Sequence, residues 1–135
     1  MPRPRPRTLL PLIAVALAGC TAGQATSAGK FKGEEKKVAE VVDDLQTAGQ
    51  AKDAGEICSR ILAPELVDKL AAPGRSCSDE VDKALDDADD FALDVKDVAV
   101  TGTTATARVE DADDKPRELR LVKQSAGWRI ASLGA

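Results

Sequence analysis

The side chains that could do chemistry in this sequence are three cysteines and many carboxylates. The chain has 23 acidic and 19 basic residues, and it contains no histidine and no tyrosine. The cysteines are Cys20, Cys58 and Cys77, and no two of them have the C-x-x-C spacing of redox and metal motifs. Without histidine, acid–base catalysis would need a buried Asp or Glu with a raised pKa.

The segment before Cys20 has the order of an export signal. Residues 1–7 carry three arginines and no acidic residue, and an apolar run follows at 9–18. As a helix, ten such residues would be about 15 Å long, about half the thickness of a hydrocarbon core. The run is therefore too short for a permanent membrane span, and we expect residues 1–19 to be a signal peptide that is removed.

The end of that segment, Leu17, Ala18, Gly19 and Cys20, resembles the lipobox of bacterial lipoproteins. Small residues before the cysteine let extended backbone enter a peptidase groove, and the thiol is the nucleophile for diacylglyceryl transfer. The resemblance implies a lipid anchor of two or three acyl chains, such as palmitate, on Cys20 at the extracytoplasmic face of the cell membrane. The alternatives are an ordinary signal peptide with a chance cysteine and an uncleaved anchor, and both leave the domain outside the cytoplasm.

With Cys20 assigned to lipid, Cys58 and Cys77 remain as an even pair in a compartment where disulfides persist. We expect these two cysteines to be bonded. Closing a loop of about twenty residues contributes on the order of 3 kcal/mol in the chain-entropy model. A redox or metal role is the competing interpretation, and we expect no metal and no cofactor.

The charge of the mature chain excludes one class of partner. Loss of the three N-terminal arginines leaves a net charge of about −7 by simple count. Two phenylalanines and one tryptophan offer little surface on which bases could stack. We therefore expect no nucleic acid, and the expected partners are the membrane, through Cys20, and an unidentified small ligand or envelope protein.

Residues 20–32 are small and polar with no apolar period, which predicts a flexible tether spanning about 20 Å. Helical patterns begin at Gly33, with apolar side chains at the spacing of one buried face: Val38, Val41, Val42, Leu45 and Ala48. Asp53 and Glu56 have the spacing of a capping box for a second helix. Pro64 begins a third helix, and Ser76 can cap a fourth at 77–87.

After Asp90 the apolar period changes to two, which predicts antiparallel strands. The parity of the alternation slips at Lys96 and Asp97, which indicates a bulge or bend. Residues 101–103 and 111–114 read as turns. Helices followed by a meander of strands predict one α+β domain over residues 33–135.

This order of elements resembles the nuclear transport factor two-like superfamily, over about residues 34–133. The resemblance rests on three segments: the opening Val-Val-Asp-Asp-Leu helix at 41–45, Ala-Gly-Glu-Ile-Cys at 54–58, and the closing hairpin 119–131 with its Gly-Trp-Arg-Ile end. It implies a curved antiparallel sheet around the long first helix, a cone that in some members encloses a pocket. A pocket here would be lined by Val41, Leu45, Leu93 and Trp128.

That superfamily includes enzymes, ligand carriers and partner-binding modules, so fold alone does not decide function. The sparse chemistry of this chain favours a non-catalytic small-ligand-binding or accessory module. The alternative is a protein-interaction module that docks or dimerises through its sheet face. A cryptic isomerase-like or dehydratase-like enzyme comes third, with Asp94 or Asp97 as its proton-transfer group.

Other charged and aromatic side chains have structural interpretations beside functional ones. The acidic clusters 86–90 and 110–114 fit solvated turns better than weak divalent-cation sites, because neither has the EF-hand spacing. We expect Trp128 to be a core residue rather than a binding platform. Three arginines could line up across the strands, and pairing with neighbouring acids explains them without a ligand; they are Arg108, Arg120 and Arg129, beside Glu110 and Glu118.

Overall fold

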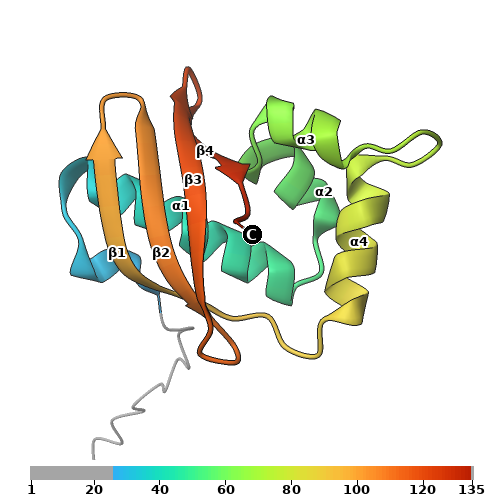
Figure 1. Ribbon diagram of the computed structural model, residues 1–135, viewed down its shortest axis with the longest axis horizontal. Coiled ribbons are helices and arrows are strands. Elements are labelled where there is room, and N and C mark those ends of the chain that lie inside the picture. The colour runs from blue at the N-terminus through green and yellow to red at the C-terminus, as the bar shows by residue number, and fades with distance from the viewer. Residues whose placement is uncertain (1–25, 135) are drawn as a thin grey trace, which may run out of the picture.

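The computed structural model describes residues 26–134 of the 135-residue chain (Figure 1). The expected signal peptide, Cys20 and the first part of the expected tether lie outside the described residues. Helices precede strands, as the sequence predicts, and the described chain is α+β. The helical elements are η1 (Ala28–Lys30), α1 (Gly33–Gln50), α2 (Ala54–Glu56), η2 (Ile57–Ile61), α3 (Pro64–Leu70) and α4 (Cys77–Asp87). The strands are β1 (Leu93–Thr101), β2 (Thr104–Asp111), β3 (Pro116–Gln124) and β4 (Gly127–Ser132).

The four strands form an open antiparallel meander in the order β1-β2-β3-β4. The β1–β2 register shifts between Val95 and Asp97, which confirms the predicted bulge. Gly102 forms the tight β1–β2 turn with a φ of +59°, a conformation that costs a glycine little. The turn is short, so consecutive strands pair directly with each other.

Helix α1 lies across one face of the sheet, α2, η2, α3 and α4 lie on the β4 side, and η1 lies on the β1 side (Figure 1). The backbone beyond η2 runs parallel to β4, where the Ala63 N–H donates to the Ile130 carbonyl at 2.8 Å. No described helix covers the opposite face of the sheet (Figure 1). The apolar core therefore lies between the sheet and α1, and one sheet face is left to solvent.

The core consists mainly of small aliphatic side chains. Its largest fully buried members are Leu62, Leu121, Ile130, Val38, Val42, Val95 and Val109. Gly49 of α1 packs directly against Phe91 of the α4–β1 connection, where a Cβ on Gly49 would collide with the Phe91 ring. Helix α1 continues through Gly49 to Gln50, although a glycine lowers helix propensity.

The packed domain begins earlier than its composition predicts. The backbone N–H groups of Ser27 and Ala28 each donate to the buried carboxylate of Asp43 at 2.9 Å. The Ser27 hydroxyl accepts from the Val95 N–H at 3.0 Å. Residues 27–32 are therefore not part of a free tether, which is a correction to the expected boundary at 33. The segment needs no apolar period in the sequence, because hydrogen bonds to Asp43 and Val95, together with the packing of Ala28 and Phe31 on the core, hold it in place.

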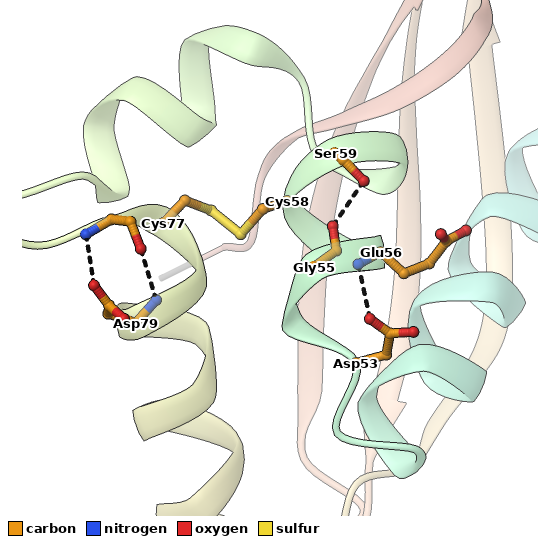
Figure 2. Close-up of a disulfide and its surroundings, with 8 residues drawn as sticks. Asp53, Gly55, Glu56, Cys58, Ser59, Cys77 and Asp79 are labelled. Atoms are coloured by element: carbon orange, nitrogen blue, oxygen red, sulfur yellow. Dashed lines mark hydrogen bonds between the residues drawn. A yellow bond between two sulfur atoms is a disulfide. The ribbon is translucent and has the colours of Figure 1, made fainter.

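The expected pairing of Cys58 with Cys77 is confirmed, with 6.1 Å between the two Cα atoms. Figure 2 shows the bond joining η2 to the first residue of α4, next to two helix caps. Asp53 accepts from the Glu56 N–H, and Ser76 and Asp79 form a reciprocal capping box. The disulfide thus joins α4, whose first turn is capped, to η2, which directly follows the capped α2.

The Asp43 carboxylate gives the first prediction. Asp43→Ala should lower the free energy of unfolding by about 3 kcal/mol, because two buried N–H groups lose a charged acceptor. Urea unfolding measures this loss, and limited proteolysis should show new cleavage between residues 27 and 33. Asp44→Ala is the matched control, since Asp44 is exposed and its loss should change stability by less than about 0.5 kcal/mol. Equal losses in the two variants would contradict a specific role for Asp43.

The disulfide gives the second. Replacing both cysteines, as Cys58→Ala with Cys77→Ala, should cost about 3 kcal/mol, because a loop spanning 19 residues is no longer closed in the unfolded chain. Denaturant unfolding with and without a thiol reductant measures the cost. The reductant should destabilise the natural chain and leave the double variant unchanged; a reductant effect on the double variant would point to another cause.

Candidate functional site

The candidate binding site is a hollow of about 520 Å³ at one end of the domain. It lies between the later part of α1, the α4–β1 connection and the β2–β3 turn. We call it the acidic hollow. It is lined by Leu45, Asp87, Ala88, Asp89, Asp90, Phe91, Ala92, Leu93, Asp111, Ala112, Asp113, Arg117, Leu119 and Leu133.

The floor of the acidic hollow is apolar. Leu45 comes from α1, Leu93 and Leu119 come from β1 and β3, and all three belong to the buried core. Phe91 is half-buried above Gly49, and Leu133, at 39% exposure, is the exposed large hydrophobic side chain of residues 26–134. An apolar ligand group placed here would extend the existing core rather than create a separate contact.

The rim of the acidic hollow is negatively charged. Two clusters that are far apart in the sequence, 86–90 and 110–114, supply its five aspartates. Asp87 has an ion pair with Lys83 at 3.1 Å. Within the described part of the chain, Asp89, Asp90 and Asp113 have no ion pair. This meeting of the two acidic segments depends on the α4–β1 connection passing beside the β2–β3 turn, and no local pattern predicts it.

Asp111 has a structural role within this rim. Its carboxylate accepts from Arg117 Nε at 2.9 Å and from the N–H groups of Asp113 and Lys115, both at 3.0 Å. The Arg117 guanidinium and then these backbone donors hold the pKa of Asp111 below its usual range. The pair closes the β2–β3 turn and leaves the other rim carboxylates to face solvent.

A second hollow, of about 630 Å³, adjoins the first and shares Leu93 and Asp111 with it. It includes Asp94, one of the two carboxylates considered for catalysis. Lys96, at 2.6 Å, Lys30 and the Ser27 hydroxyl all contact Asp94 and hold its pKa at about 2. A carboxylate that stays ionised and multiply paired is poorly suited to exchange protons near neutral pH. Asp97, the other candidate, is exposed at the bulge.

The four predicted pocket residues are divided between two places. Leu45 and Leu93 line the acidic hollow, whereas Val41 and Trp128 line a separate hollow of about 450 Å³ beside η2. No hollow found within residues 26–134 is lined by all four. The space between the sheet and α1 is filled by core side chains, and the two pairs line different hollows.

Trp128 is buried, and its environment includes a residue that sequence reasoning missed. Glu34, in the first turn of α1, accepts from Trp128 Nε1 at 2.8 Å, from Lys37 at 2.9 Å and from Lys123 at 3.1 Å. Lys123 also lies 5.9 Å from the centroid of the indole ring. The hydrogen bonds from Lys37, Trp128 and Lys123 lower the pKa of Glu34 to about 2. This cluster ties the start of α1 to the β3–β4 hairpin.

Near Val41, burial is the main cause that raises the pKa of Asp44, and the nearby carboxylates of Asp43, Glu40 and Glu56 add to it. Asp44 is nevertheless exposed and lines the open hollow beside η2. Repulsion by the neighbouring acids of α1 and α2 thus adds to the effect of burial, and the charge of Arg60 opposes it.

The three arginines considered above lie on the outer face of the sheet, but they do not form the predicted ion pairs with Glu110 and Glu118. Glu110 pairs with Lys96 at 3.3 Å, and Arg129 donates to the Ser59 carbonyl at 2.9 Å. Among residues 26–134, no carboxylate lies within ion-pair distance of Arg108 or Arg120. These two line an open groove of about 810 Å³ across β2 and β3. The expected pairs are therefore wrong: Lys96 reaches Glu110 at the bulge, and β4 directs Arg129 to η2.

Glu34 gives the third prediction. A folded-state pKa of about 2 against an ordinary value of 4.5 means that this carboxylate adds stability above pH 4.5 and loses it as the pH falls toward 2. Glu34→Gln should remove this part of the acid sensitivity. Acid titration followed by fluorescence of Trp128, the single tryptophan, measures it. The neighbouring variant Glu35→Gln should keep the natural profile, and an unchanged profile in Glu34→Gln would contradict the assignment.

Comparison with known proteins identifies no family for this chain. No family model, curated protein or solved structure matches the chain. In the described part, no helix is both long and apolar enough to cross a membrane. The same residues hold no group of three or more Asp, Glu, Cys or His side chains arranged to bind a metal ion. Function has to be inferred from the residues and their arrangement.

Proposed function

We propose that this protein is a lipid-anchored extracytoplasmic lipoprotein whose domain is a non-catalytic binding module. The observation that carries the binding role is the acidic hollow, where an open apolar floor meets a charged rim. Apolar surface with a few polar groups around it is the common composition of ligand sites. The acidic hollow lies at one end of α1, so a ligand would bind there without displacing core side chains.

The anchor is supported by the order of the first twenty residues. An arginine-rich start, a short apolar run and Leu17-Ala18-Gly19-Cys20 follow one another as lipid attachment to Cys20 requires. The Cys58–Cys77 disulfide agrees with an oxidising compartment outside the cytoplasm. Two or three acyl chains would hold the chain at the membrane far more strongly than one.

We further propose that the domain has the nuclear transport factor two-like fold. A long first helix packed on one face of a curved antiparallel meander supports this assignment (Figure 1). Because core side chains fill the layer between helix and sheet, we propose that a ligand binds at the end of this layer rather than inside it. A catalytic role has little support, because Asp94 is held ionised by two lysines.

The second candidate function is protein docking through the open sheet face. Arg108 and Arg120 favour it, since both line the groove on that face and neither has an ion pair in the described chain. A partner with acidic side chains would supply carboxylates to pair with these two arginines. The groove shares Arg117 with the acidic hollow, and its other lining residues lie outside that hollow, so variants at Arg108 and Arg120 test docking separately.

The fourth prediction tests the anchor and the binding module in one preparation. In cells given labelled palmitate, the natural chain should take up label and be cut before Cys20, whereas Cys20→Ser should do neither. Gel autoradiography and intact-mass measurement provide the readout. The variant Cys58→Ala with Cys77→Ala is the control, because it loses two thiols and should keep the label.

An unlabelled natural chain with its first nineteen residues intact would contradict the lipoprotein assignment.

The labelled protein, extracted in mild detergent, is then examined by native mass spectrometry. A bound molecule is expected in the natural chain and at a lower level in Leu133→Ser, which alters the floor of the acidic hollow. Enzymatic turnover of that molecule would contradict the non-catalytic role.

A further inference from the structure

We propose that the acidic hollow binds a cationic, amphipathic peptide segment at the membrane surface. This inference rests on the proposed function, because it names the ligand of the same hollow and uses the lipid anchor to place it. It is carried by three observations: the charge of the rim, the apolar floor, and the point where the chain enters the domain.

The rim selects positive charge. Five aspartates and one arginine line the acidic hollow, and Arg117 is already engaged by Asp111. Asp89, Asp90 and Asp113 have no ion pair within residues 26–134, so their charges are available to a ligand. A positively charged group would be attracted at distances up to the Debye length of about 8 Å, and an anion would be repelled.

The floor disfavours a simple metal ion as the occupant. The described carboxylates do not converge into a group of three that could hold a metal. Between them lie apolar side chains, including half-buried Phe91 and Leu133, whose 39% exposure leaves much of its surface in contact with water. Covering these side chains needs an apolar group on the ligand, which a hydrated cation lacks.

The shape favours an extended segment over a compact small molecule. The acidic hollow is open to solvent and continues past Leu93 and Asp111 into the adjoining hollow of about 630 Å³. Two lysines line that second hollow, but both are already paired with carboxylates: Lys30 with Asp94, and Lys96 with Asp94 and Glu110. A small molecule needs a site that encloses most of its surface. An extended chain can place lysine or arginine side chains on the rim and alternate side chains on the floor.

The anchor brings this site close to the lipid. Ser27 is held by Asp43 and Val95, and Ser27 also lines the adjoining hollow. Only residues 21–26 then separate Cys20 from the domain, and six residues reach about 20 Å at full extension. Anionic lipids concentrate basic peptides at the membrane surface, so the hollow would meet this class of ligand there.

The fifth prediction uses the lipidated full-length protein in phosphatidylcholine vesicles. The probe is a labelled hexapeptide of alternating lysine and leucine, with glutamate–leucine and lysine–serine hexapeptides and protein-free vesicles as controls. Flotation of the vesicles reports anchoring of the protein and binding of the peptide separately. We expect the lysine–leucine peptide to float with the protein, to bind more weakly at high salt, and to bind better than either control peptide.

Variants then locate the site. The triple variant Asp89→Asn, Asp90→Asn and Asp113→Asn should weaken binding at least about tenfold, and Leu133→Ser should weaken it through the floor. The charge-matched control is Asp68→Asn, Asp82→Asn and Asp97→Asn, whose positions are exposed and lie outside the hollow. It should bind within about twofold of the natural chain. Urea unfolding midpoints establish that each variant is folded.

The outcomes are distinguishable. Binding that depends on the rim and floor supports the proposal. If the protein floats but the lysine–leucine peptide does not, or if the control variant loses as much binding as the rim variant, the peptide proposal is overturned and the anchor remains. If the protein itself fails to float, the proposed lipoprotein function is overturned.

Discussion

The packing of α1 against one face of the sheet is the interaction on which the other features depend. The helix presents a stripe of small apolar side chains, including Val38, Val42 and Leu45, and the strands present Val95 and Leu121 opposite it. Each such side chain contributes about 2 kcal/mol when it is removed from water. These side chains fill the layer between the helix and the sheet.

Polar contacts fix the helix in this position along its length. Glu34 binds the β3–β4 hairpin at the first turn, Asp43 binds the incoming chain at Ser27, and Gln46 accepts the Leu93 N–H at 2.7 Å. Each contact satisfies a group that burial would otherwise leave without a partner. The same contacts set the start of β1 and the point where the chain enters, and these two positions define the end of the molecule where the hollows open.

The carboxylates of this acidic chain consequently fall into two groups. Asp94, Asp111 and Glu34 have lowered pKa values because cations and hydrogen-bond donors surround them, and they act as structural joints. Asp89 and Asp90 sit where the α4–β1 connection passes the β2–β3 turn and lack such partners in the described chain. From composition alone, the carboxylates of both groups would be interpreted as solvent-exposed surface charges. Their difference is what makes one end of the domain a candidate binding surface.

Local patterns predict the element order, the α4 cap at Ser76 and the bulge near Lys96, because each depends on residues close together in the sequence. The Cys58–Cys77 pair follows from counting the cysteines. Contacts across the fold decided the rest. The packing of residues 27–32, the role of Glu34 and the meeting of the two acidic clusters all join segments far apart in the chain. Periodicity describes which face a residue occupies but carries no distance between elements, so only the tertiary structure could bring these groups together.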